Sequence, residues 1–218
     1  MRPCSSLKFF FASCLALVCV AASAQNSVQD VALRVDRHYN QLRSLRASFS
    51  ERYSGLGMER SESGTLLLEK PGRMKWLYQS TPGKYFLLTG KFAYFYAPGD
   101  TQVQRLNASQ LDDLRSPLRF LLGHTRLESE LTNLAISTAP NGSFTLSGIP
   151  KGQEKRISAL NLTVTAAGSI TAIDIRDQDG SETRFTLTDQ SENPSFPADT
   201  FRFTAPAGVP VSDALPPA

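Results

Sequence analysis

The chain has 218 residues, of which 41% are hydrophobic and 20% charged, with 23 basic against 20 acidic side chains. A net charge this near neutral, without clustered basic and aromatic residues, argues against a nucleic-acid partner. The sequence has only three cysteines and two histidines, so it offers few side chains for a metal site or for thiol chemistry.

The segment Met1–Ala24 predicts a secretory signal peptide. Arg2 and Lys8 give a basic start, an apolar run follows, and Ala22-Ser23-Ala24 supplies the small residues of a cleavage site. The run is too short and wrongly flanked for a membrane span, although an uncleaved anchor is the alternative. Cleavage after Ala24 would leave about 194 residues, which suits a single exported domain over residues 25–218.

All three cysteines, Cys4, Cys14 and Cys19, lie inside this signal segment. The exported domain is therefore expected to depend on its core, without a disulfide. Lipidation of a cysteine is the competing hypothesis. It is disfavoured because the apolar run before Cys14 is short and Val18 is too large for the position before Cys19.

The exported part opens with an amphipathic helix and a strand. Apolar residues recur at three- and four-residue steps, with Asn26 or Ser27 as a cap, which predicts a helix over Val28–Arg43. Leu45–Tyr53 alternates apolar and polar residues, as strands do. A turn at Ser54-Gly55-Leu56-Gly57 follows, and the polar segment Met58–Ser63 leads into the next part of the chain.

The stretch from Gly64 to Pro98 predicts an antiparallel meander with one apolar face. Pro-Gly pairs and Gly90 supply its turns. It holds the one tryptophan and many of the other aromatic residues, so we expect the functional apolar surface here, although an ordinary core is the plain alternative. Its predicted strands are Thr65–Lys70, Arg73–Tyr78, Lys84–Leu88 and Lys91–Ala97, and the aromatic residues in question, with Phe49, are Trp76, Tyr78, Phe86, Phe92 and Phe95.

The rest of the chain predicts more strands and two short helices. A strand at Gln102–Leu106 precedes helices at Ser109–Leu114 and Ser116–Leu122, and the second helix is so apolar that it must plug the core or close a cavity. Later strands are expected at Asn133–Thr138, Ser143–Ser147, Ala159–Val164, Ile170–Arg176, Glu182–Thr188 and Phe201–Thr204, before an irregular tail from Pro206. The sum is a mainly β protein with one strongly curved antiparallel sheet of about ten or eleven strands.

No catalytic motif stands out. The sequence lacks a Gly-x-Ser-x-Gly elbow, a phosphate-binding loop and a His-Glu-x-x-His pair. His38 and His124 have no metal-ligating partners at suitable spacing. We therefore predict a protein that is not an enzyme and that needs no cofactor or metal.

Lys70 is the one charged residue whose position suggests a functional role. It ends an apolar strand and shares a face with Leu66 and Leu68. If that face lines an interior, Lys70 could donate hydrogen bonds to carbonyls at a helix end or pair with an acidic headgroup. The alternative is a solvated strand-end residue that extends away from the core.

Four segments, in matching order and spacing, resemble the LolA family of periplasmic lipoprotein carriers. They are GTLLLEKPGRMKW, GKFAYFYAPGDTQV, SPLRFLLG and FRFTAPAGVPVSD, and the opening helix and RASF fit the same order. The resemblance implies an unclosed antiparallel β-barrel with a lid of short helices. It also implies acylated lipoproteins as cargo, an inner-membrane ABC-type release complex and an outer-membrane receptor lipoprotein as partners, and a carrier that is monomeric.

The resemblance also assigns roles to individual residues. In the family, the basic residue before the proline is typically an arginine that hydrogen-bonds the lid, and here the latch would be Lys70 and Pro71. Lysine is a point donor without the planar fork of arginine, so a weaker latch is expected. The acyl-chain cavity would be lined by Phe49, Leu66, Leu68, Met74 and Trp76, with Leu121 and Leu122 from the lid.

Two other functions fit the same residues. A carrier or sensor of another lipid or glycolipid would use the same fold and the same apolar face. A structural module would use the aromatic residues as core alone.

Overall fold

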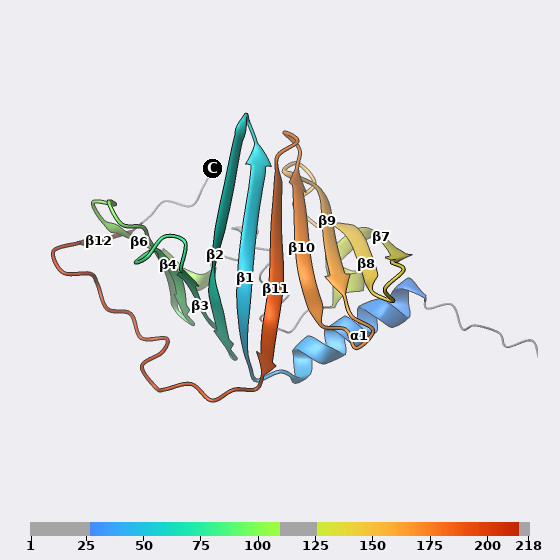
Figure 1. Ribbon diagram of the computed structural model, residues 1–218, viewed down its shortest axis with the longest axis horizontal. Coiled ribbons are helices and arrows are strands. Elements are labelled where there is room, and N and C mark those ends of the chain that lie inside the picture. The colour runs from blue at the N-terminus through green and yellow to red at the C-terminus, as the bar shows by residue number, and fades with distance from the viewer. Residues whose placement is uncertain (1–26, 110–125, 214–218) are drawn as a thin grey trace, which may run out of the picture.

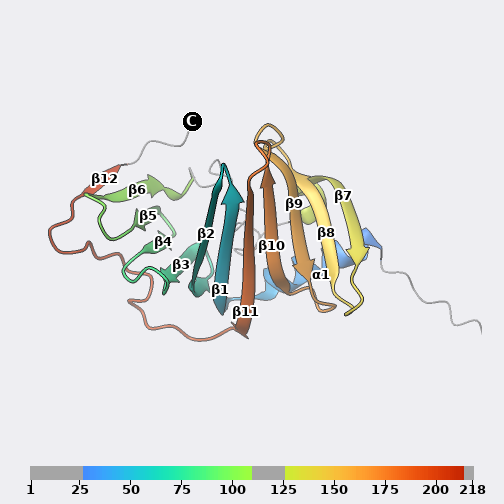
Figure 2. The ribbon, with the colours of Figure 1, turned by 45° about the horizontal axis from the view of Figure 1, so that its top comes forward.

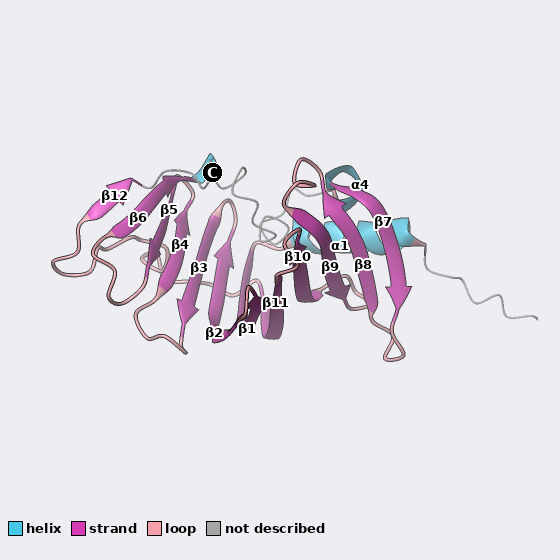
Figure 3. Ribbon diagram, turned by 90° about the horizontal axis from the view of Figure 1, so that it is seen from above, coloured by secondary structure: helices cyan, strands magenta, loops and turns pink. Residues whose placement is uncertain are grey.

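The computed structural model describes residues 27–109 and 126–213 (Figure 1). One 12-stranded sheet dominates it, and the sheet bends so that α1 and α4 lie on its concave side (Figure 3). A mainly β protein with one open, curved sheet is thus confirmed. The strand order is β12-β6-β5-β4-β3-β2-β1-β11-β10-β9-β8-β7.

The first strand lies at the centre of the sheet. β1 (Ser44–Gly55) pairs with β2 (Met58–Glu69) on one side and with β11 (Glu182–Glu192) on the other. β1 therefore joins two meanders. One consists of β2 with β3 (Arg73–Tyr78), β4 (Tyr85–Thr89), β5 (Phe92–Tyr96) and β6 (Val103–Asn107); the other consists of β7 (Leu131–Thr138), β8 (Phe144–Pro150), β9 (Ile157–Val164), β10 (Ile170–Asp177) and β11.

The helix α1 (Val28–Gln41) covers the concave face of the second meander. Ser27 and Asp30 form a capping box at its start, and Val31, Val35 and Tyr39 are buried against the sheet. The turn between β9 and β10 comes so close that a Cβ on Gly168 would lie 2.6 Å from the Arg34 carbonyl carbon. The short helix α4 (Leu127–Glu130) is tied to α1 by the Leu127 N–H, which donates to both carboxylate oxygens of Asp36 at 3.1 and 3.2 Å.

Two predictions about strands were wrong. Met58–Ser63 is not a lead-in but the first half of β2, which pairs with β1 along its whole length. Phe201–Thr204 is irregular, and the last strand is β12 (Val211–Asp213), parallel to β6. The alternation of Phe201 and Phe203 reflects packing onto a sheet face: Phe201 is buried, and Phe203 stacks on Tyr94 with ring centroids 3.8 Å apart.

The segment from residue 194 to residue 210 runs from the C-terminal end of β11 to β12 at the far edge of the sheet (Figure 2). Its Phe196, Phe201 and Phe203 pack against Leu87 and Tyr94 in a cluster separate from the one that holds the neighbouring residues Leu88 and Ala93. Because successive strand residues point to opposite faces, this segment covers the convex face of β4 and β5.

Several predicted elements lie outside the described residues. These are the signal segment and, apart from Ser109, the two short helices predicted at Ser109–Leu114 and Ser116–Leu122. Across the part of the chain that the structure does describe, no helix has both the length and the apolar character needed to span a bilayer.

Candidate functional site

The predicted cavity residues of the first meander lie together on the concave face. Leu66 pairs with Trp76 and Leu68 with Met74 across β2 and β3, and Phe49 lies opposite Gly64 across β1 and β2. All of these side chains are buried in one cluster. Leu121 and Leu122 lie outside the described residues. Contact with acyl chains stays a prediction for the whole set.

Aromatic rings form the centre of this face. Phe49 meets Trp76 edge-to-face with centroids 4.6 Å apart, and Tyr78 lies 5.2 Å from Phe49. Gly64 makes room for the Phe49 ring, since a Cβ there would lie 2.8 Å from Phe49 Cε1. Phe185 of β11 completes the group at 5.5 Å from Trp76. The sequence predicted its strand but not its role, although the alternation of Thr183, Phe185 and Leu187 was available as a signal.

Part of the concave face is only half-buried. Phe86 and Phe95 of β4 and β5 pack against the cluster with centroids 4.7 Å apart, yet both stay partly exposed. Phe92 does not belong here. It lies with Tyr94 and Tyr96 on the convex face, because it differs from Phe95 by an odd number of residues. The structure therefore offers partly exposed apolar surface on the concave side of the first meander.

Lys70 reaches a helix end, as one of the two hypotheses for it required. Its side-chain Nζ donates to the carbonyl oxygen of Tyr39 in the last turn of α1. Its backbone N–H donates to the carbonyl oxygen of Arg43 at 2.8 Å. Burial lowers the pKa of Lys70. A cis peptide bond joins Lys70 to Pro71 ahead of β3. Any contact of Lys70 with the short helices predicted at Ser109–Leu114 and Ser116–Leu122 stays a prediction, because residues 110–125 lie outside the described part of the chain.

Asp36 is a residue that sequence analysis missed. It lies on the buried side of α1 and accepts the Leu127 N–H, and burial raises its pKa. The available signal was an acidic residue on the otherwise apolar stripe of Val31, Val35 and Tyr39. Its carboxylate fixes α4 against α1.

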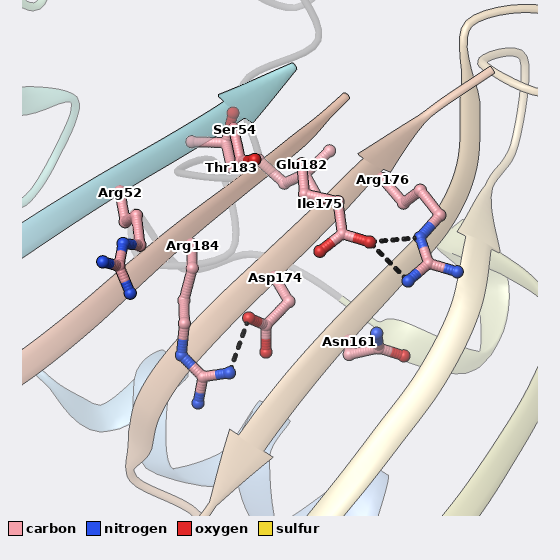
Figure 4. A pocket seen from close by; sticks show the side chains of 9 residues that line it. All are labelled: Arg52, Ser54, Asn161, Asp174, Ile175, Arg176, Glu182, Thr183 and Arg184. Carbon is pink, nitrogen blue, oxygen red and sulfur yellow. Dashed lines mark hydrogen bonds and ion pairs between the residues drawn. The ribbon is translucent and has the colours of Figure 1, made fainter. Parts of the chain in front are cut away.

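The convex face of the second meander is polar. A shallow pocket of about 330 Å³ lies there (Figure 4), where Asp174 pairs with Arg184 at 3.0 Å and Glu182 with Arg176 at 2.5 Å. These are cross-strand pairs between β10 and β11. Residues 27–109 and 126–213 contain no group of His, Cys, Asp or Glu able to hold a metal ion.

Fold and site together define a binding protein whose open, curved sheet presents apolar surface on its concave side. The family model described as "Outer membrane lipoprotein carrier protein LolA" matches residues 40–204, and the chain belongs to this family.

Relatives support the same assignment over nearly the whole chain. The chain is 27% identical over 206 residues to the outer-membrane lipoprotein carrier protein of Cupriavidus necator, covering 90% of this chain and 93% of the relative. It is 29% identical over 209 residues to that of Sodalis glossinidius, covering 94% and 98%. An uncharacterized conserved protein from Thermus thermophilus has the same fold, with a TM-score of 0.54 at 13% identity over 87% of this chain and 100% of that chain.

Proposed function

We propose that this protein carries lipoproteins through the periplasm, with their acyl chains bound to the concave face of the sheet. The observation that carries the proposal is the partly exposed apolar surface around Phe86 and Phe95, next to the aromatic group of Phe49, Trp76 and Phe185. Its relatives over nearly the full length are outer-membrane lipoprotein carrier proteins.

The physical need for such a carrier is large. Burial of an acyl chain is worth about 0.8 kcal/mol per CH₂, so three chains of ~15 methylenes represent roughly 35 kcal/mol that water would oppose. A carrier must shield a useful part of this surface and still release it. A face that is apolar but not filled by the chain's own side chains meets both requirements.

Release and loading require a mechanism for opening. The bond from Lys70 to the carbonyl oxygen of Tyr39 ties the end of β2 to α1, and we assign Lys70 and Pro71 the role of a latch for the closed state. Opening exchanges contacts within the protein for contacts with the chains, so the strength of the latch sets the affinity for cargo.

The direction of lipoprotein transfer is set by the donor and acceptor that the carrier meets. The sequence carries no nucleotide-binding motif, so the work of extracting a lipoprotein must come from elsewhere. The family resemblance supports an inner-membrane ABC-type release complex as the donor and an outer-membrane receptor lipoprotein as the acceptor.

The test uses Trp76, the chain's one tryptophan, which is buried among the proposed cavity residues. Acylated lipopeptides with bromine atoms on their chains should quench its fluorescence, whereas unbrominated lipopeptides of the same length should not. Native mass spectrometry of protein purified gently from the host periplasm should then show bound lipoprotein. A bound free lipid or glycolipid would favour the alternative carrier, and absence of both quenching and cargo would contradict the proposal.

A further inference from the structure

Four charged side chains lie on the same concave face, beyond the aromatic group. We call them the charged quartet: Glu51, Arg60, Glu62 and Lys84. Lys84 Nζ contacts both carboxylate oxygens of Glu62 at 2.6 Å, and Arg60 lies 3.3 Å from Glu62 and 3.5 Å from Glu51. Glu51 and Phe49 are two residues apart on β1, so both point to the concave side.

The quartet is joined directly to the aromatic group. The Lys84 ammonium lies 4.2 Å from the centre of the Tyr78 ring, which packs on Phe49. Burial and the nearby charges of Glu51 and Glu62 raise the pKa of the Tyr78 hydroxyl. Apolar and charged parts therefore form one continuous surface.

The two carboxylates lie deep and the two cations lie outside them. The side chains of Glu62 and Glu51 are 7% and 11% exposed, whereas those of Lys84 and Arg60 are 24% and 59% exposed. Lysine has three N–H donors and arginine five, more than the contacts with the carboxylates use. The accessible surface of the quartet is thus rich in hydrogen-bond donors.

Polarity changes in one direction along β1 and β2. Starting at the end near α1, β2 presents Leu68 and Leu66, then Gly64 beneath the rings, then Glu62 and Arg60. At about 3.3 Å per residue, this series spans roughly 26 Å. An acylated amphiphile has the same order, with apolar chains, then ester and amide carbonyls that only accept hydrogen bonds, then a polar head.

We propose that the charged quartet is a second subsite, which binds the ester and amide carbonyls of the cargo and so fixes its orientation. The acyl chains then point toward α1, and the polar head leaves near the turn between β1 and β2. This inference rests on the proposed carrier function and adds to it the part of the cargo that the protein recognises.

The test compares two lipopeptides with equal chain lengths and the same head, one with ester-linked chains and one with ether-linked chains. Ethers lack the carbonyl acceptors. Hydrogen bonds to charged donors are strong enough for the wild type to bind the ester form about tenfold more tightly. Affinity is measured below the micelle concentration by displacement of a hydrophobic fluorophore.

The variants separate the quartet from general effects. Arg60→Gln alters the most exposed member. The double variant Glu62→Gln with Lys84→Met removes a whole ion pair without leaving a buried charge unpaired, because Glu51 keeps its contact with Arg60. Arg52→Gln is the matched control, since Arg52 lies on the neighbouring strand, opposite Ser61, and lines the polar pocket of the convex face (Figure 4). Ester preference should fall in the first two variants and persist in the control.

Each outcome decides between the two proposals. Equal binding of ester and ether by the wild type, or an ester preference that survives in both quartet variants, would overturn the second subsite and leave the carrier function intact. Failure of the wild type to bind either lipopeptide would instead overturn the carrier function.

Discussion

The two meanders of the sheet differ in which faces are covered. The meander β7–β11 is covered on its concave face, whereas the meander β2–β6 is covered on both faces, although Phe86 and Phe95 on its concave side stay partly exposed. In the meander β7–β11, α1 covers the concave face, where Leu160, Leu162 and Ile173 are fully buried, and the convex face carries solvated ion pairs. In the meander β2–β6, the C-terminal segment covers the convex face through Phe201, Phe196 and Phe203.

This difference explains how the chain can be stable and still leave apolar surface unfilled. A sheet needs at least one well-packed face. The first meander obtains one from the C-terminal segment, so the part of its concave face around Phe86 and Phe95 need not be closed by the protein's own core. The second meander has no such freedom, because the apolar cover from α1 and from Leu127 of α4 lies on its concave face.

The largest expected effect comes from the closed meander. Leu162 is fully buried under α1, and Leu162→Ala should cost about 3–4 kcal/mol through lost transfer energy and a residual cavity. Chemical denaturation measures it. A cost below about 1 kcal/mol would mean that this face is loosely packed and that the contrast between the two meanders is wrong.

The next prediction removes the convex cover of the open meander. Phe201 is 5% exposed, and Phe201→Ala should cost about 3 kcal/mol. Amide hydrogen exchange should accelerate in β4 and β5 and stay slow in β9 and β10. Phe201→Leu is the control and should restore most of the protection. Equal loss of protection in both meanders would contradict a separate role for this segment.

Alkaline pH tests the buried rings of the concave side. Burial raises the pKa of Tyr39 to about 12, and burial together with the charges of Glu51 and Glu62 also raises the pKa of Tyr78. Unfolded tyrosines ionise near pH 10, so between about pH 10 and 12 the folded state holds more protons than the unfolded state. Stability present below pH 10 should therefore be lost as pH rises through this window, by on the order of 2 kcal/mol.

Urea midpoints measured from pH 9 to 11 give this slope. Tyr39→Phe serves as the control, because it removes one ionising group and should make the slope shallower. An unchanged slope in that variant would show that Tyr39 does not contribute.

The latch prediction concerns one hydrogen bond. Lys70→Leu loses the contact with Tyr39 O and should cost about 1 kcal/mol. If the latch limits exchange of cargo, the variant should accumulate as cargo-loaded protein in the periplasm. Unchanged release of cargo by the variant would contradict the latch, whatever its stability.

Much of the fold could be predicted from the sequence, because strands with one apolar face carry a period-two pattern. The concave positions Leu66, Leu68, Met74 and Trp76 came directly from that pattern, and the structure brings them together. The error over Met58–Ser63 has a physical cause. There β2 is polar on both faces, and charge pairs such as Glu62 with Lys84 take the place of apolar contacts.

Other features depend on long-range register, which the sequence does not reveal. Glu51 and Arg60 meet because β1 and β2 form a long hairpin with a turn at Leu56 and Gly57. Lys84 joins them from beyond β3. Likewise, nothing local shows that Phe201 would pack on a sheet face without pairing as a strand, because both arrangements give the same alternation.

The smallest expected change in stability bears most directly on the open face. Phe95 pairs with Phe86 across β4 and β5 and stays partly exposed, so Phe95→Ala should cost less than about 1 kcal/mol, the range for a cross-strand pair. If this face binds acyl chains, the same variant should lose several-fold in affinity for an acylated lipopeptide, measured by Trp76 fluorescence. The matched change on the convex face is Phe203→Ala, which should lower stability and leave that affinity unchanged, because Phe203 stacks on Tyr94 away from the concave side. A reversed result, with affinity lost in Phe203→Ala and kept in Phe95→Ala, would place the ligand on the other face of the sheet.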